Sequence, residues 1–373
     1  MQTTQIRWTP DKQWSNSAED LRDANLVLVF ADHEFFQTPA CYLYLKDHFP
    51  RAHIVGCSSA GSVLNNTISD NDVVVTAVRF EHGTVRTAVA QATVDGDIRT
   101  LASGLMEQLR SDELRHVLVF SDGLSVNGSE LASGLNGYNL PVTGGLAGDG
   151  TRFGKTWVMA DAVAQQGTVV AVGLYGDLVI KSGCFAGWQE FGAERVVTKS
   201  HGNVVSEIDN QPALALYKKY LGDLAEQLPS SGLRFPLSVR ADKNDNTPII
   251  RTLLGVDENA QSLTFAGDVP QGSLCKLMRT NLDDLIENAG MAADMAKSQQ
   301  ADAAGLCVVV SCVGRRLVLG QLTEEELDVV QQKLGTKTTI TGFYSYGELA
   351  PFSDIMQCQL HNQTMTLTTI YEQ

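Results

Sequence analysis

The sequence predicts an α/β protein of mixed type, in which two related domains of mixed β-sheets are covered by helices. The first observation is a repeat: an apolar strand, a helix and a second strand that ends in a glycine turn occur in this order three times. The second is that antiparallel strands extend these parallel units, which makes the sheets mixed. The leading strands are predicted at 26–31, 117–121 and 306–311, and the turns at 56–61, 144–149 and 342–347.

The three glycine turns are related in sequence. The first and third share isoleucine, glycine, serine and glycine at equal offsets, and the second, around Gly145, is a looser copy. Glycine permits positive φ and lets another backbone or a ligand come close. A single turn of this kind is more often only a tight turn. Three of them favour a shared pocket, because strand ends gather at one edge of a sheet, and we expect that pocket near a domain interface.

Antiparallel strands fill the chain between these units. Segments 73–80 and 85–90 are predicted to form a hairpin, and the last strands, 354–361 and 364–371, a second hairpin that turns at Asn362 and Gln363. A meander is predicted for 155–164, 167–175 and 177–184.

The length predicts two domains. A chain of 373 residues exceeds the usual size of one hydrophobic core. We place the boundary near residue 201, which gives a first domain at 1–200 and a second at 201–373.

Composition argues against several classes of function. The net charge is −15 and no run of Lys or Arg occurs, so a nucleic-acid or anionic-membrane surface is not expected. No apolar run is long enough to span a bilayer, and the first residues lack the regions of a signal peptide. The seven cysteines contain no CxxC pair, which favours free thiols in a reducing cytoplasm over a zinc cage or a disulfide framework.

The first glycine turn holds two candidate nucleophiles, Ser58 and Ser59. The spacing from Gly56 to Gly61 is one residue longer than the Gly-x-Ser-x-Gly elbow of hydrolases, and the sequence places no histidine to activate either serine. Hydroxyls that bond the turn backbone are the commoner case. The turn, with Cys57, is therefore a candidate for ligand binding rather than for catalysis.

Cys312 ends an apolar strand and is followed by Arg315 and Arg316. A neighbouring guanidinium lowers the pKa of a thiol, so Cys312 is predicted to be the most reactive cysteine. The alternative is a buried cysteine that packs as a small hydrophobe. Arg315 is suited either to a bidentate bond with a ligand carboxylate or to an ion pair on the surface.

Two carboxylates, Asp149 and Glu348, each follow a glycine turn, and Tyr346 lies within the third turn. We expect Asp149, Glu348, Cys312 and Arg315 to face the cleft and the carboxylates to receive an amine or hydroxyl of a ligand. A turn or helix cap is the commoner role for such a carboxylate.

Five segments of the chain closely resemble the FIST family. They are 56–61, 144–149, 187–188, 312–315 and 342–348, and matches run in the family's order from about residue 25 to 369. The resemblance implies an N-terminal and a C-terminal FIST domain that together form a sensory, small-ligand-binding module. As a stand-alone form, without an F-box or a fused kinase, the chain is similar to the bacterial haem-containing, nitric-oxide-sensing members of the family. Those proteins act on a partner histidine kinase or cyclic-di-GMP enzyme.

Haem is implied by this resemblance, and the sequence adds only a ranking of ligands. The seven histidines form no HxH, HExxH or Cys/His cluster, so a multi-histidine metal cage is not supported. A haem iron needs one protein ligand. His361, which we expect to project from the polar C-terminal hairpin, ranks first, ahead of His201 and His33. For any single histidine a hydrogen-bonded or solvated role is commoner.

Three hypotheses of function follow. The first is a haem or nitric-oxide sensor that regulates a signalling enzyme. The second is a binding module for a small polar metabolite such as an amino acid. The third is a hydrolase or transferase that uses Ser58, Ser59 or Cys312, although no complete catalytic constellation is present.

Overall fold

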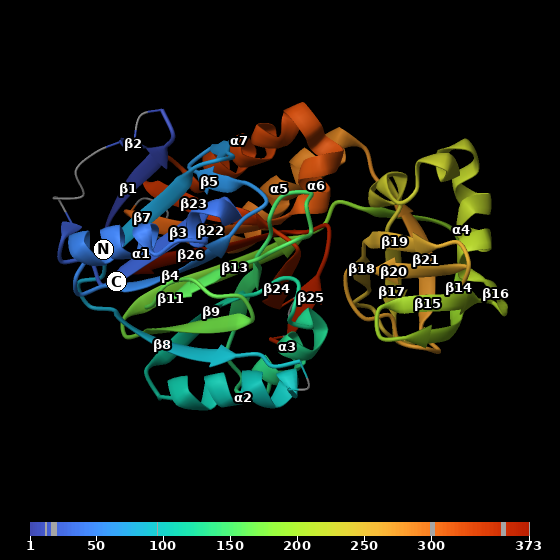
Figure 1. The fold of residues 1–373 in the computed structure, drawn as a ribbon, viewed down its shortest axis with the longest axis horizontal. Coiled ribbons are helices and arrows are strands. Elements are labelled where there is room, and N and C mark those ends of the chain that lie inside the picture. Colours follow the sequence, from blue (N-terminus) through green and yellow to red (C-terminus); the bar gives the residue numbers. More distant parts are fainter. Residues whose placement is uncertain (12, 16–20, 95, 299–302, 352–355, 373) are drawn as a thin grey trace.

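The computed structural model describes residues 1–11, 13–15, 21–94, 96–298, 303–351 and 356–372. It consists of a main body and a small lobe that stands beside it (Figure 1). The main body contains three six-stranded sheets, and the small lobe contains a separate eight-stranded sheet. The lobe is formed by residues 189–279, so it is inserted into the chain of the main body.

Each sheet of the main body is built on the same three strands. Two parallel strands are joined through a helix, and an antiparallel strand pairs with the first of them. The three sets are β3 (Leu26–Ala31), β4 (His53–Ser58) and β7 (Val73–Arg79); β9 (Leu114–Ser121), β10 (Val142–Leu146) and β12 (Thr168–Tyr175); and β22 (Gly305–Cys312), β23 (Thr338–Ser345) and β26 (Met365–Glu372). The joining helices are α1 (Ala40–His48), α3 (Gly128–Leu135), and α6 (Val313–Leu319) with α7 (Thr323–Leu334). The predicted mixed sheets and repeated strand–helix–strand units are therefore confirmed.

The edges of these sheets are exchanged between the units. The second parallel strand of each sheet is covered by a strand from another unit, namely β11 (Val158–Ala160) on β4, β24 (Gly347–Pro351) on β10 and β5 (Ser62–Leu64) on β23. The opposite edges carry β1 (Gln2–Thr9), β8 (Thr84–Gln91) and β13 (Leu178–Phe185). Three short strands lie at the outermost positions: β2 (Gln13–Trp14) beside β1, β25 (Cys358–His361) beside β24, and β6 (Thr67–Ser69) beside β5. Because two of the sheets contain strands from both halves of the chain, the expected division into 1–200 and 201–373 does not coincide with the spatial units.

The predicted hairpins and meander do not form. Strands β7 and β8 belong to different sheets, as do β25 and β26, and β11, β12 and β13 each belong to a different sheet. Residues 354–355 of the last predicted strand lie outside the described residues. The connection after β7 is held by Glu372, whose carboxylate accepts the backbone N–H groups of Glu81, His82 and Gly83. Turn signals predict where strands end, but they do not determine which sheet the next strand joins.

The three sheets share one hydrophobic core. Alternate residues of the leading strands, including Leu28, Leu118 and Val308, belong to a single buried cluster. At its centre the rings of Phe30, Phe120 and Phe343 lie with centroids 5.0–6.0 Å apart. The other faces of the sheets are covered by α1, by α2 (Ile98–Leu109) and α3, and by α5 (Leu282–Ala296) and α7.

The shape that the three units share depends on three glycines inside the second parallel strands. Gly56, Gly144 and Gly342 each lie opposite a valine of the leading strand. A Cβ atom on any of them would lie 1.8–1.9 Å from the carbonyl oxygen of that valine. Gly144 and Gly342 also have φ of +149° and +155°. These glycines therefore allow close contact between strands and do not themselves form the turns, which begin further on.

The small lobe is an antiparallel sheet with one α-helix and two 3-10 helices, η3 (Gly222–Gln227) and η4 (Ser230–Arg234). Its elements are β14 (Gln189–His201), β15 (Val204–Ile208), β16 (Gln211–Pro212), α4 (Ala213–Leu221), β17 (Leu237–Arg240), β18 (Ile249–Arg251), β19 (Leu253–Asp257), β20 (Ser262–Phe265) and β21 (Leu274–Arg279). Buried residues of α4 and of these strands form a core of their own. The boundary predicted near residue 201 falls at the end of β14.

We predict that Gly56→Ala destabilises the protein by more than about 3 kcal/mol, because the added methyl group would overlap the backbone of Val29. Gly104→Ala is the control, since Gly104 is exposed in α2 with no atom within 4 Å of the added Cβ. That variant should be about 1 kcal/mol more stable than the wild type. Urea unfolding of both variants measures the difference in stability. Equal urea midpoints for the two variants would contradict the close contact between Gly56 and Val29.

Candidate functional site

A cleft of about 860 Å³ lies between the main body and the small lobe. This volume is in the range of small-molecule sites. The main-body wall is formed by the chain beyond the strands of the second and third units, within 123–128, 151–153 and 312–318, together with Leu146 and Tyr346. The small-lobe wall is contributed by residues within 224–235, 252–254 and 265–268. The strand ends of two of the three units therefore face one cleft.

Large apolar side chains stand exposed around this cleft. Five residues of its lining are 39–45% exposed, namely Leu124, Phe153, Leu224, Leu254 and Leu317. They come from both walls, so they are not the exposed edge of a single core. Exposed apolar groups that gather around a concave surface are typical of an interaction site.

The charged groups of the cleft are few. The charged residues of its described lining are Arg234 and Asp268, which carry opposite charges. Two further lining residues, Thr252 and Asn362, are buried, and their side-chain oxygens have no hydrogen-bond partner among the described residues. The amide nitrogen of Asn362 donates to the carbonyl of His361 at 3.0 Å, so its oxygen is left as an acceptor. The cleft is thus suited to a largely apolar molecule with a small number of polar groups.

A loop that we call the strap, residues 150–155, crosses the rim of this cleft. Asp149 holds it, because one carboxylate oxygen accepts the N–H groups of Gly154 and Lys155 at 2.8 Å each. The other oxygen accepts the Tyr346 hydroxyl. Burial raises the pKa of Asp149, but the hydrogen bonds from Tyr346 and from the strap outweigh it, and the pKa lies below its usual range. The Asp149 carboxylate is therefore an ionised anchor of the strap.

Aromatic stacking fixes the middle of the strap. The ring of Phe153 lies on that of Tyr346 with centroids 4.6 Å apart and 18° between their planes. Burial and the neighbouring Asp149 carboxylate raise the pKa of Tyr346, so its hydroxyl keeps its proton. Arg152 pairs with Asp32 of the first unit at 2.7 Å.

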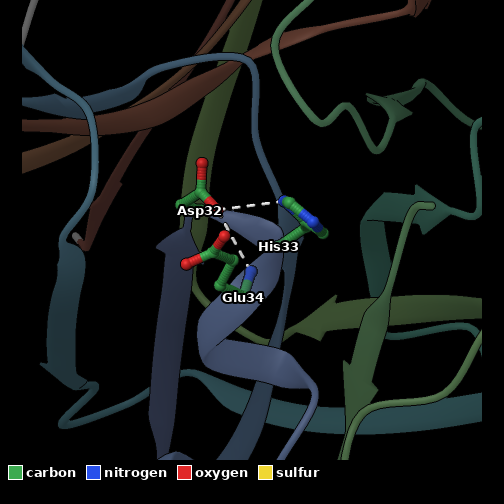
Figure 2. Close-up of side chains that lie close together, drawn as sticks. All are labelled: Asp32, His33 and Glu34. Carbon is green, nitrogen blue, oxygen red and sulfur yellow. Dashed lines mark hydrogen bonds and ion pairs between the residues drawn. The ribbon is translucent and has the colours of Figure 1, made fainter. Parts of the chain in front are cut away.

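Asp32, His33 and Glu34 form a group of possible metal ligands, with donor atoms within 4.8 Å of one another (Figure 2). The Asp32 carboxylate caps the short helix η2 (His33–Phe36) by accepting the N–H of Glu34 at 3.1 Å, and it also pairs with Arg152. These bonds give the carboxylate a structural role without an ion.

Comparison with protein families gives two matches that follow one another along the chain. A FIST N domain matches residues 25–211, and a FIST C domain matches residues 213–351. The chain belongs to the FIST family. FIST domains are sensory domains of signal transduction that bind small ligands.

Individual relatives are distant. An uncharacterized protein of Methanocaldococcus jannaschii is 24% identical over 377 residues, which cover 88% of this chain and 69% of that protein. Among solved structures, a chorismatase aligns over 99% of this chain and 98% of its own at 9% identity and a TM-score of 0.38. A cyanuric acid hydrolase from A. caulinodans aligns over 100% and 99% at 8% identity and a TM-score of 0.37. These structural similarities are too weak to bear on function.

The FIST N residues of the first turn lie in the main body and not in the cleft lining. The Ser58 hydroxyl accepts the N–H of Trp157 at 3.0 Å, and the Ser59 hydroxyl lies 2.9 Å from that of Ser62. Cys57 is buried in the common core, and Gly56 serves the strand contact described above. The Ser59 hydroxyl also accepts the N–H of Gly61 within the turn, at 3.4 Å, whereas Ser58 joins the turn to a distant part of the chain.

Gly145 belongs to the packing between units. A Cβ atom there would lie 2.5 Å from the Val310 side chain, so the position has no space for one. The residue pairs with Glu348 across β10 and β24. Its backbone thus joins the second and third units but is not part of the cleft lining.

Arg315 does not face the cleft. Its guanidinium donates to the Glu326 carboxylate at 2.8 and 3.1 Å, and both side chains are fully buried. It also donates to the carbonyls of Ala186 and Leu285. The second oxygen of Glu326 accepts the Tyr344 hydroxyl at 2.6 Å. Arg315 therefore holds the third unit together, and removing it would leave a buried carboxylate without its cation.

Cys312 lines the cleft, but the prediction of a reactive thiol is wrong. The residue is 3% exposed, and burial raises the pKa of its thiol far above the usual range. Arg315 and Arg316 do not stabilise a thiolate, because their guanidiniums are bound to Glu326 and Asp70. The alternative reading, a cysteine that packs as a small hydrophobe, describes it correctly.

Glu348 is fully buried beside the third unit and does not line the cleft. Its two oxygens accept the hydroxyls of Ser345 at 2.5 Å and Thr364 at 2.9 Å. Burial raises the pKa of Glu348 to about 8 even though these hydrogen bonds and Arg315 lower it. At neutral pH the carboxyl is therefore mostly protonated, and it links β24 to the end of β23 and to the residue that precedes β26.

His361 does not project from a hairpin. It ends β25, it is 2% exposed, and its Nε2 lies 3.1 Å from the carbonyl oxygen of Ala350. Burial lowers the pKa of the imidazole to about 4, so the ring is neutral. The described lining of the cleft contains no histidine. The lining residues whose side chains can bind a haem iron are Cys312 and Tyr346. Both bind iron as anions, and the raised pKa values of the thiol and the phenol disfavour these anions. These residues do not fit a haem as the structure stands.

Sequence reasoning missed Phe153 and the whole small-lobe wall. The sequence could have indicated Phe153, because the segment after Asp149 reads as a turn between Gly150 and Gly154, and an aromatic residue is unusual there. The small-lobe residues had none, since they are scattered leucines, phenylalanines and polar residues that form no motif.

The raised pKa of Glu348 predicts a pH dependence of stability. In the unfolded chain the carboxyl ionises near pH 4.5, whereas the folded protein keeps the proton up to about pH 8. The wild type should therefore lose stability relative to Glu348→Gln between these values, by at most about 1.4 kcal/mol per pH unit. Urea unfolding at pH 5 and pH 8 measures this, and a difference between the two proteins that does not change with pH would show that Glu348 is ionised in the fold.

Proposed function

We propose that this FIST protein is a sensor whose small-molecule ligand binds in the cleft between the main body and the small lobe, and that binding draws the lobe onto the body. The observation that carries the proposal is the set of exposed apolar side chains on both walls of the cleft. Closure around a ligand would remove these groups from water, which stabilises the closed state by about 25 cal/mol per Å² of apolar surface.

The attachment of the lobe is suited to such a movement. Two chain connections, around residues 186–188 and 280–281, join it to the main body. Arg251 donates to the Leu360 carbonyl at 2.9 Å, and Gln363 donates to the Leu233 carbonyl at 3.1 Å. Ile250 and Met278 of the lobe also pack against Leu285 of the main body in a small buried cluster. In this proposal the lobe rotates as a unit about that cluster and the two connections. The ligand shifts this equilibrium only by as much as it prefers the closed state.

The change of shape is the signal in this proposal. A partner protein that recognises one arrangement of the lobe would read the presence of the ligand. In line with the family resemblance, we propose a histidine kinase or a cyclic-di-GMP enzyme as that partner, and a cytoplasmic location. The location is supported by the seven cysteines, all of which are free thiols. No helix among the described residues is long and apolar enough to cross a membrane.

A thermal-shift screen of small metabolites, amino acids among them, tests the site. We predict that any ligand found loses at least tenfold in affinity in Leu254→Asp, because the new carboxylate lies in the cleft wall. Leu43→Asp is the matched control, since Leu43 is 58% exposed and lies outside the cleft. Equal affinities of the two variants would place the ligand elsewhere.

The narrower proposal is that the ligand system is haem with nitric oxide. It is supported by the family resemblance and requires movement of His361 away from the Ala350 carbonyl. The test is the visible spectrum of wild type, His361→Ala and His201→Ala after reconstitution with haem. This proposal predicts a Soret band that shifts with nitric oxide and is altered in His361→Ala alone. The absence of a Soret band in the wild type would remove it and leave the cleft proposal intact.

A further inference from the structure

We infer that Phe153 selects the ligand: the strap holds its ring at the rim of the cleft so that a ring-bearing molecule, neutral or singly charged, stacks on it. The inference rests on the proposed function, because it takes the cleft as the ligand site. It adds the chemical class of the ligand and the residue that recognises it.

The backbone of Phe153 is the first support. Its φ is +48°, in the left-handed region. Of the other nine non-glycine residues with positive φ in the described chain, six are Asn or Asp, which adopt this conformation more easily, and three are Gln. A bulky aromatic residue in a strained conformation persists only where the surroundings impose it, and such positions cluster at binding sites.

The surroundings that impose it come from all three units. Arg152 is paired with Asp32 of the first unit, and Gly154 donates to Asp149, which follows β10 of the second unit. Phe153 itself is stacked on Tyr346 of the third unit. Despite these anchors the ring remains 45% exposed, and it is the only aromatic side chain among the exposed large hydrophobic residues that the structure describes. The fold thus fixes one face of the ring on Tyr346 and leaves part of it open toward solvent at the cleft.

The remaining lining defines the ligand class. An exposed aromatic face favours another ring, because offset stacking adds to the gain from burial. Arg234 and Asp268 balance each other, so the cleft lacks the several cations that a polyphosphate would need. The unpartnered oxygen of Asn362 accepts a hydrogen bond, and the Thr252 hydroxyl can accept or donate one, so a hydroxyl or N–H of the ligand suits both. These features together fit a flat, largely apolar molecule with a hydrogen-bond donor.

Two probes of equal charge test this selection. Anilinonaphthalene sulfonate is a ring-bearing monoanion with one N–H donor, and decanoate is an aliphatic monoanion. We expect Phe153→Leu to weaken dye binding about fivefold and decanoate binding less than twofold, since leucine keeps the apolar surface and removes the ring. Phe153→Asn should weaken the dye at least as much, because Asn accepts the positive φ and preserves the strap. Leu317→Ala, at the same rim, is the control and should affect both probes alike.

The outcomes separate this inference from the proposed function. If Leu254→Asp weakens both probes but Phe153→Leu weakens them equally or not at all, the cleft is the site and the selection by Phe153 is overturned. If Leu254→Asp changes neither, the probes do not bind in the cleft and this inference is overturned, whereas the proposed function fails only if the ligands of the thermal-shift screen also bind Leu254→Asp unchanged. Absence of saturable dye binding to the wild type also overturns the inference. Unchanged thermal midpoints in the Phe153 variants confirm that the loss is local.

Discussion

The main body depends on a contact between backbones that tolerates no side chain. At Gly56, Gly144 and Gly342 the second parallel strand approaches the leading strand so closely that a Cβ atom would overlap a carbonyl oxygen. The same contact recurs in all three sheets, and their inner faces meet at Phe30, Phe120 and Phe343. Because the sheets converge on one core, their strand ends lie near one another. The strap and the cleft are consequences of that convergence.

Much of this architecture could be predicted from the sequence, and the reason lies in local patterns. The glycine-containing segments and the apolar strands before them are each encoded within a short stretch of sequence, so the repeated units were predictable. The pairing of β5 with β23, or of β24 with β10, is set by residues hundreds of positions apart. No turn signal carries that information, and for this reason the hairpins expected at 73–90 and 354–371 do not exist.

The candidate site was predictable only in part, for a related reason. Cys312 and Tyr346 could be placed at the cleft because strand ends share one edge of a sheet. Arg315 and Glu348 follow the same strands, but their side chains turn inward, and a sequence does not show on which side of a turn a charge lies. The partner that neutralises Arg315, Glu326, is on the next helix, so the charge that looked available for a ligand is already bound.

The exchange of edge strands also determines the order in which the molecule can assemble. None of the three sheets is complete until strands from a distant part of the chain arrive, and the third must wait for β26 at the C-terminal end to pair with both β13 and β22. Contacts of such long sequence separation form slowly. The small lobe pairs strands within a span of some ninety residues and has its own core, so it can fold first, and the body then assembles beside a lobe that is already formed.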